Sequence, residues 1–169
     1  MCIIIDANSL GSVFDKSAKG HEKFKPIFDW IFYGRGKVVF GGSRYFSEIV
    51  GKYSALFIEL RKANMAVPID NAKVDATTKT VSKLLKHRDF DDQHLVGLLI
   101  VSGCKLICSL DDRAYPFFQH EKFFSPASKR PKIYRGAKKN NELLINKNIA
   151  DVCQPCRTTT KAQRELINF

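Results

Sequence analysis

The feature that most constrains the fold of this chain is a series of short apolar runs separated by segments of helix length. The runs are Cys2–Ile5, residues 37–40, residues 65–69 and Leu106–Cys108. Unbroken apolar runs of this kind are typical of strands buried on both faces, as in a parallel sheet. Pro68 favours an edge position for the third strand, because proline cannot donate a backbone hydrogen bond. Strands that alternate with helices predict a three-layer α/β fold with a mostly parallel central sheet.

Helical patterns fill the gaps between these runs. Apolar residues at helical spacing from Phe24 to Ile31 predict a helix that ends near Gly34. We expect three further helices: one capped by Ser43 and continuing to Tyr53, one capped by Asp70, and one over residues 91–102 with Gly103 as its stop.

Positive charge is concentrated towards the C-terminus. The net charge is +11, and residues 121–169 hold 11 Lys and Arg against 4 acidic residues. Such an excess is expected of a surface that meets polyphosphate, although positive charge also aids solubility. The longest apolar stretch has seven residues, which is too short to cross a membrane, and the first residues do not resemble a signal peptide. We therefore expect a cytoplasmic protein with no membrane partner.

The composition of the sequence changes near residue 125, where a basic stretch that contains prolines begins. We expect a catalytic domain over residues 1–125 and a basic extension over residues 126–169, packed on or flanking the same domain. Its prolines and Gly136 predict a loop, in which Tyr134 could stack on an unpaired base while cations contact phosphates. A basic loop that is only solvated is the alternative. The expected nucleic-acid contacts are Lys129, Arg130, Lys132, Tyr134, Arg135, Lys138 and Lys139.

The five cysteines predict thiols rather than a disulfide framework, because their number is odd and no leader is evident. Cys153 and Cys156 form one C-x-x-C pair. A structural zinc site normally takes four ligands, and no second pair follows at suitable spacing. The sequence therefore favours thiols over a zinc site.

Several carboxylates follow predicted strands, at the end of a parallel sheet where ligands bind. Asp6 follows the first strand and Asp111 follows the fourth, and ligands bind at the carboxyl ends of such strands. Asp91 and Asp92 open the buried helix, and Glu48 lies on the helix after the second strand. Each aspartate could instead cap a helix, and Glu48 could be a solvated helix residue. Taken together, the carboxylates would repel one another, and Mg²⁺ or Mn²⁺ is the compensation that suits carboxylate oxygens.

These residues also carry a resemblance to a known family. The segment Ile3-Ile4-Ile5-Asp6-Ala7-Asn8 resembles the opening of PIN domains, in which a strand delivers an aspartate followed two residues later by Asn, Ser or Thr. Asp92 with Gly103 eleven residues on, and then Ser109 two residues before Asp111, resemble the second PIN signature. Glu48 matches the remaining acidic position. The resemblance covers roughly residues 1–120.

The resemblance implies a metal-dependent nuclease. It would make Asp6, Glu48, Asp92 and Asp111 the ligands of Mg²⁺ or Mn²⁺. Asn8 and Ser109 would orient the site and Asp112 would assist. The choice between Asp91 and Asp92 stays open on helical periodicity, and only the step to Gly103 favours Asp92.

The expected function is an endoribonuclease with an RNA substrate, because compact PIN domains cut RNA and many bacterial members are toxins or defence effectors. A DNA nuclease of the same mechanism and a catalytically silent RNA-binding scaffold are the alternatives. A phosphoryl-acceptor receiver domain also uses aspartates at strand ends, but it would carry an acidic pair at the first strand, where Asp6 stands alone. The sequence leaves an inhibitory partner protein and a homo-oligomer open.

Overall fold

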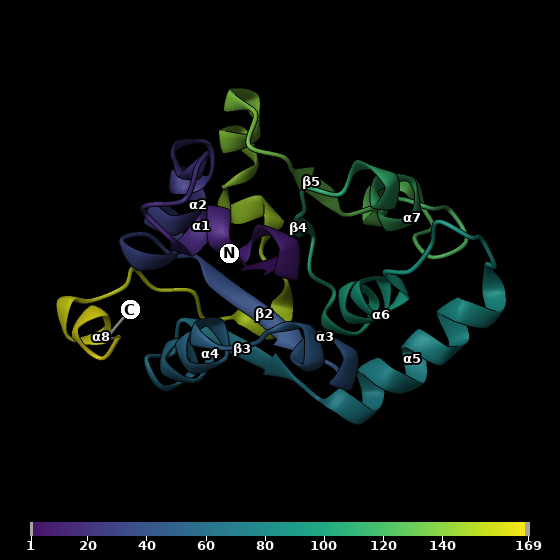
Figure 1. Cartoon of the computed structure of the whole chain (residues 1–169), viewed down its shortest axis with the longest axis horizontal. Coiled ribbons are helices and arrows are strands. Elements are labelled where there is room, and N and C mark those ends of the chain that lie inside the picture. Colours follow the sequence, from purple (N-terminus) through teal and green to yellow (C-terminus); the bar gives the residue numbers. More distant parts are fainter. Residues whose placement is uncertain (1, 168–169) are drawn as a thin grey trace.

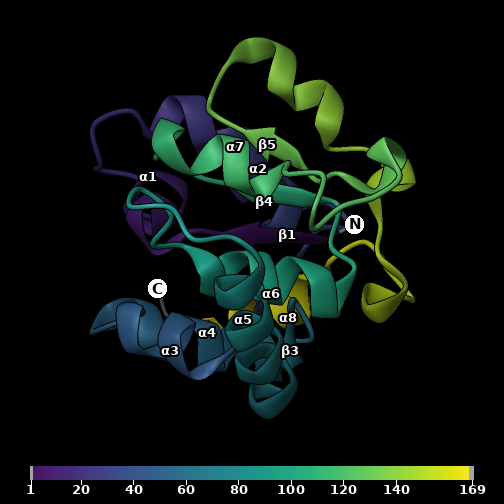
Figure 2. The ribbon, with the colours of Figure 1, turned by 90° about the vertical axis from the view of Figure 1, so that its right-hand side faces the viewer.

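A computed structural model describes residues 2–167 and shows five parallel strands flanked by helices (Figures 1 and 2). The strand order is β3-β2-β1-β4-β5, and every neighbouring pair is parallel. The strands are β1 (Cys2–Ile5), β2 (Lys37–Gly41), β3 (Ala66–Ile69), β4 (Leu106–Cys108) and β5 (Lys132–Tyr134). The three-layer α/β prediction is confirmed.

The helices form two layers on the sheet. In Figure 1, α1, α2 and α4 lie to the left of the strands and α5, α6 and α7 to the right. This division follows from right-handed crossovers, because the chain moves from β1 to β3 in one direction and returns to β4 and β5 in the other. The α-helices are α1 (Leu10–Phe14), α2 (His21–Phe32), α3 (Ser43–Glu48), α4 (Lys52–Lys62), α5 (Asn71–Leu84), α6 (Gln93–Ser102), α7 (Tyr115–Phe118) and α8 (Lys161–Glu165).

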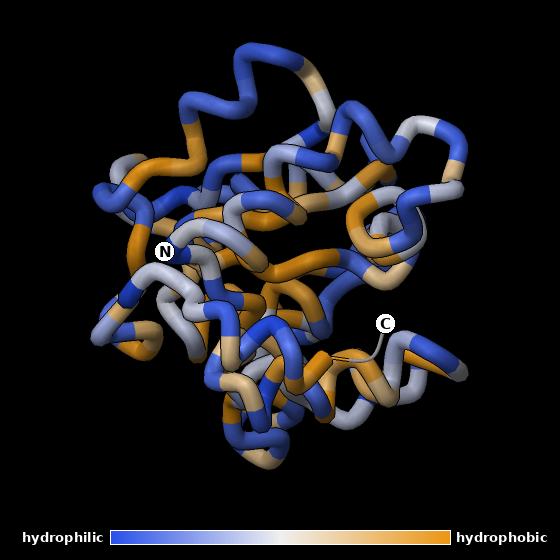
Figure 3. The backbone as a smooth tube through the Cα atoms, turned by 90° about the vertical axis from the view of Figure 1, so that its left-hand side faces the viewer, coloured by the Kyte–Doolittle hydropathy of each residue, from blue (hydrophilic) through white to orange (hydrophobic). Residues whose placement is uncertain are grey.

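Short 3₁₀ turns complete the chain, and four of them lie after α7. They are η1 (Ala7–Ser9), η2 (Asp112–Ala114), η3 (Ala127–Lys129), η4 (Lys138–Leu143), η5 (Asn146–Asn148) and η6 (Asp151–Cys153). The core is made by the strands and the helix faces that cover them. Cys2–Ile5 and Leu106–Cys108 are buried throughout, as unbroken apolar runs predict. Hydrophobic segments accordingly run through the middle of the molecule in Figure 3.

Several sequence-based predictions about the elements are confirmed. β3, which contains Pro68, is an edge strand. Asp70 caps α5 by accepting a hydrogen bond from the Lys73 backbone N–H at 2.8 Å. Gly103 ends α6 in the left-handed region with φ of 62°, which glycine adopts without the steric cost of a Cβ.

The prediction for the helix after Ser43 is wrong in two respects. The segment breaks into α3 and α4 at Gly51, whose φ of 61° is left-handed. Gly42, not Ser43, is the N-cap of α3, and the Ser43 hydroxyl instead donates to Asp75 Oδ2 of α5 at 2.6 Å. This hydrogen bond connects the start of α3 to α5. At the other end of α3, Glu48 lies beside His94 of α6.

The prediction that the segment after residue 126 is a loop is wrong at β5. Residues Lys132–Tyr134 pair with Leu106–Cys108 as the fifth strand. Tyr134 is fully buried, and its hydroxyl donates to Asn141 Oδ1 at 2.7 Å. Burial raises the pKa of Tyr134 to about 12. The ring packs beside Phe24, so Tyr134 is a core residue and cannot stack on a nucleic-acid base.

No helix among residues 2–167 is long and apolar enough to cross a membrane.

Candidate carboxylate site

Asp6 and Ser109 meet because β1 and β4 are parallel neighbours in a matching register. Ile5 is paired with Cys108, so the next residue of each strand lies at the same edge of the sheet. The Asp6 backbone N–H donates to the Cys108 carbonyl at 2.9 Å, and the Ser109 hydroxyl donates to Asp6 Oδ2 at 2.7 Å. The carboxyl edge of the sheet thus fixes the Asp6 carboxylate in position.

Two polar side chains hold the loops around Asp6. Ser109 Oγ accepts a hydrogen bond from the Asp111 backbone N–H at 3.1 Å. Asn8 Oδ1 accepts one from the Ser9 hydroxyl at 2.8 Å and one from the Leu110 N–H at 3.4 Å. Asn8 and Ser109 therefore connect the turn after β1 to the turn after β4.

Asp6 is buried, and this burial has an electrostatic consequence. Loss of solvent raises the pKa of Asp6, whereas the hydrogen bonds from Ser109 and the Asn8 N–H lower it in part. The negative charge of Glu48 adds to the rise. The buried carboxylate is therefore costly in its charged form, and a bound cation would stabilise it.

Asp92 shows the effect of the cluster most clearly. Burial, followed by the charges of Asp6, Asp91, Glu48 and Asp111, raises the pKa of Asp92 to about 7. Asp92 occupies the N-cap position of α6, yet its side chain makes no capping hydrogen bond. Asp92 is half-buried and Asp91 is exposed. Between the two aspartates, the structure therefore favours Asp92 as the member of the cluster.

Glu48 and Asp111 belong to the same cluster but face arginines. Arg44 Nε lies 2.7 Å from Glu48 Oε1, and Arg113 donates to both Asp111 oxygens at 3.1 and 2.8 Å. The contact with Arg113 lowers the pKa of Asp111. Both arginines are exposed residues, so these pairs are screened by solvent and can be displaced at small cost.

His94 lies beneath Glu48. Its Nε2 is 3.1 Å from Glu48 Oε2, outside hydrogen-bond geometry, and its Nδ1 has no hydrogen-bond partner within residues 2–167. Burial lowers the pKa of His94, although the charge of Glu48 opposes that shift. The buried imidazole therefore packs against the Glu48 carboxylate.

Helix capping, the alternative for each carboxylate, accounts for part of the arrangement. Asp6 and Asp111 each accept a backbone hydrogen bond in the following 3₁₀ turn, at 3.4 Å from Asn8 and 3.0 Å from Arg113. Asp92 and Glu48 do not cap, and Glu48 is not simply solvated. Asp112, expected to assist, is exposed at the start of η2.

The donor set suits a hard divalent cation, although the side chains are not arranged around one. No group of three or more His, Cys, Asp or Glu within the described chain could hold a metal ion as the side chains stand. Glu48 and Asp111 point to arginines, and no basic side chain in residues 2–167 pairs with Asp6 or Asp92. Carboxylate oxygens that raise one another's pKa are relieved by Mg²⁺ or Mn²⁺. The residues present therefore fit such an ion once Glu48 and Asp111 leave the arginines.

The expected basic contacts do not form one patch. Lys129, Arg130 and Lys132 precede or begin β5, at the amino end of the sheet. Arg135 follows β5 at the carboxyl end, where its guanidinium lies 5.2 Å from the centre of the Tyr115 ring. The Tyr115 hydroxyl in turn donates to the Ser109 carbonyl at 2.8 Å. Arg135 is thus on the carboxylate side of the molecule, and Lys138 and Lys139 are exposed in the turn η4 that follows.

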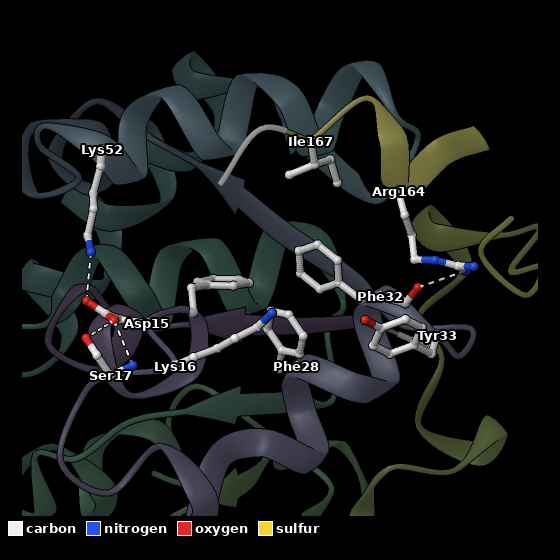
Figure 4. A pocket seen from close by; sticks show the side chains of 10 residues that line it. Asp15, Lys16, Ser17, Phe28, Phe32, Tyr33, Lys52, Arg164 and Ile167 are labelled. Atoms are coloured by element: carbon white, nitrogen blue, oxygen red, sulfur yellow. Dashed lines mark hydrogen bonds and ion pairs between the residues drawn. The ribbon is translucent and has the colours of Figure 1, made fainter. Parts of the chain in front are cut away.

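A separate cavity of about 590 Å³ lies between α1, α2 and α4 (Figure 4). Its floor is aromatic, with Phe14, Phe28 and Phe32, and Lys52 pairs with Asp15 at its rim at 2.8 Å. None of the clustered carboxylates lines it. We place the candidate site at the carboxylates rather than at this cavity. The pKa values of Asp6 and Asp92 are raised, and a bound cation would stabilise their charged forms.

Comparison of the chain with protein-family models, with curated proteins and with solved structures finds no match.

Proposed function

We propose that this protein is a divalent-metal-dependent nuclease that hydrolyses RNA phosphodiester bonds, in the manner of the PIN domains that its sequence resembles. The observation that carries the proposal is the gathering of Asp6, Glu48, Asp92 and Asp111, from four segments of the chain, at the carboxyl edge of the sheet. An all-parallel sheet places its ligands at this edge.

The proposal assigns a different role to each group of side chains at the site. Asp6, Glu48, Asp92 and Asp111 would hold Mg²⁺ or Mn²⁺, which supplies Lewis-acid stabilisation and an acidified water when bound. Asn8 and Ser109 keep Asp6 and the Asp111 backbone in register. Arg44 and Arg113, when they release their carboxylates, are placed to pair with phosphate oxygens instead.

RNA is favoured over DNA by the family resemblance alone, and DNA cleavage by the same site is the alternative. A catalytically silent RNA-binding scaffold is less consistent with the site, because each matched acidic position carries a carboxylate and Asp92 remains without a capping role. A toxin or defence role belongs to this proposal as a consequence of the resemblance, whereas an inhibitory partner and a homo-oligomer stay open.

Incubation with total RNA and with single-stranded DNA separates these functions. With Mn²⁺ we expect RNA fragments, with none when EDTA is present, because the proposed mechanism requires a bound metal ion to acidify the attacking water and to stabilise the developing charge. Cleavage of DNA but not of RNA would establish the alternative substrate. Tight RNA binding with no cleavage of either nucleic acid, with Mg²⁺ or Mn²⁺ present, would favour the silent scaffold.

The basic residues near the site predict a salt effect on RNA binding. Changing Arg135, Lys138 and Lys139 together to Ala should reduce the slope of log affinity against log salt by about 0.7 for each lost phosphate contact. The matched control changes Lys129, Arg130 and Lys132 to Ala, which removes the same charge at the other end of the sheet. Binding is measured at several salt concentrations in the non-cleaving Asp6→Asn background. Equal slopes for the two triple variants would mean that charge, not position, controls binding.

A further inference from the structure

A polar cavity of about 440 Å³ lies at the amino end of the sheet, opposite the carboxylates. One side of it is the start of β2, and a second side is the turn that follows α4. The C-terminal segment from Pro155 to Thr160 closes the cavity. The lining includes Lys37 and Arg157, and no Asp or Glu of residues 2–167 lines it. The cavity is therefore positively charged.

Lys37, the first residue of β2, is buried without a carboxylate partner. Only 8% of its surface is exposed. Its Nζ donates to Asn64 Oδ1 at 3.2 Å, and no acidic side chain within residues 2–167 forms an ion pair with it. An ammonium group has three N–H donors, of which the neutral amide oxygen satisfies one. Because buried lysines are normally paired with an acidic group, the charge of Lys37 calls for an anion from outside the chain.

Arg157 and Thr158 add a second cation and a hydroxyl to the lining of the cavity. Arg157 is exposed, and no acidic side chain of the described chain forms an ion pair with it. Arg35 Nε donates to Thr158 Oγ1 at 3.4 Å, so this hydroxyl accepts from a cation and can donate its own proton to a ligand. Ammonium, guanidinium and hydroxyl donors around one space are the groups that bind phosphate oxygens.

Hydrogen bonds fix the walls of the cavity, although the C-terminal segment has little regular structure. The backbone N–H of Thr159 donates to the Gly34 carbonyl at 2.9 Å, and its hydroxyl donates to the Ile31 carbonyl at 2.9 Å. Gln163 Nε2 donates to the Ala63 carbonyl at 2.6 Å. These bonds tie the segment to the ends of α2 and α4. The cavity is therefore preformed, as small-molecule sites usually are.

We propose that this cavity binds a phosphate group, either free or on a small organic ligand, with Lys37 and Arg157 as its counter-charges. A phosphate monoester carries a charge of about −1.5 to −2 at pH 7, which two cations balance, whereas a carboxylate would balance one of them. The volume of about 440 Å³ lies within the range of roughly 300–1,000 Å³ that small-molecule sites occupy, so a phosphate with an organic group attached fits. This site does not depend on the proposed nuclease function, because it lies at the other end of the sheet.

The test is a titration of the full chain, followed by the NMR signals of its backbone amides. The probes are inorganic phosphate, adenosine 5′-monophosphate and unphosphorylated adenosine, at constant ionic strength and with EDTA present so that no metal binds at the carboxylates. Both phosphate compounds should shift the amide signals of Lys37 and Thr158 to saturation, and adenosine should not.

The two phosphate compounds separate the sources of the anion. Tighter binding of the nucleotide would identify a phosphorylated small ligand, and tighter binding of inorganic phosphate would identify the free anion. Asp6→Asn should give the same titration as the wild type, which keeps the result independent of cleavage. Absence of saturable shifts at Lys37 and Thr158 with both phosphate compounds would overturn the proposal.

Single substitutions separate this site from the general positive charge of the protein. Lys37→Met keeps an apolar stem of similar length and removes the charge, so phosphate affinity should fall by about tenfold or more. Lys83→Met is the matched control, because it removes the same charge from an exposed position on α5; its phosphate affinity should equal that of the wild type. Arg157→Gln changes an exposed side chain, should keep the fold, and should also weaken phosphate binding. Unchanged phosphate affinity in Arg157→Gln, or in folded Lys37→Met, would refute the site.

Discussion

Replacement of Asp6 by Asn is expected to reduce RNA cleavage at saturating Mn²⁺ by at least about 10³-fold, equivalent to about 4 kcal/mol of transition-state stabilisation. Asn has the shape of Asp and can still accept the hydrogen bond from the Ser109 hydroxyl, so the fold is retained. What is lost is the negative charge at the centre of the carboxylate cluster. A divalent cation depends on that charge for binding, and the chemistry depends on the cation. Single-turnover cleavage of a labelled RNA measures the effect.

The stability of the same variant provides an internal check. Burial raises the pKa of Asp6, which means that its charged form is unfavourable in the folded state. At pH 8 in EDTA, Asp6→Asn should therefore melt at or above the temperature of the wild type. Asp29→Asn is the control, because it removes a half-buried carboxylate of α2 whose ion-pair partner among residues 2–167 is Lys25; it should leave cleavage unchanged. Full cleavage by Asp6→Asn would remove this residue from the site.

Most of the sheet could be predicted from the sequence because its strands are buried on both faces. Cys2–Ile5 and Leu106–Cys108 lie in the centre of the sheet, where an unbroken apolar run is required. β5 could not be predicted in this way, since Lys132 is exposed and Ile133 only partly buried. Its strand conformation depends on pairing with β4 and on burial of Tyr134, which are tertiary effects that local propensity does not report.

The carboxylates of the site could be predicted because the position of a residue after a parallel strand determines its edge of the sheet. Their partners are harder to predict. The pair Arg44–Glu48 is spaced i, i+4, so helical periodicity could have indicated it. His94 meets Glu48 only because α6 packs beside α3, and Arg113 reaches Asp111 through a turn. Such contacts depend on packing and turn geometry rather than on any local pattern.

The positions of the cysteines also could not be predicted from their spacing in the sequence. Cys153 and Cys156 are neighbours in the sequence, whereas Cys2 and Cys104 reach them only through the fold. One C-x-x-C pair by itself favours ordinary thiols.

Substitution of Asp92, but not of Asp91, is expected to change both activity and the dependence of stability on pH. Asp92→Asn should reduce cleavage by about 10²-fold or more, because Asp92 lies among the other carboxylates. Asp91→Asn should reduce it less than about fivefold, since Asp91 is exposed and acts on the cluster only through its charge. Cleavage rates of the two variants at saturating Mn²⁺ give the ranking, and a reversed ranking would assign the ligand to Asp91.

The stability of these two variants in EDTA tests the electrostatic reason for that ranking. The pKa of Asp92 is about 7 in the folded chain, against 3.8 for an unperturbed aspartate, so the folded state holds a proton between these values. This contribution to stability is complete below about pH 4 and is lost as the pH rises through 7. The difference between a pKa of 3.8 and one of about 7 corresponds to about 4 kcal/mol, and solvent around the half-buried Asp92 side chain reduces this to about 1–2 kcal/mol. Metal-free wild type should accordingly lose stability between pH 5 and pH 8, and Asp92→Asn should lose about 1–2 kcal/mol less, because Asn cannot ionise.

Asp91→Asn should follow the wild type much more closely, and addition of Mn²⁺ should restore stability to the wild type at pH 8 but less to Asp92→Asn. If urea unfolding gave the same pH dependence for wild type and Asp92→Asn, the cluster would not be raising the Asp92 pKa, and the case for a cation at this edge of the sheet would lose its main electrostatic support.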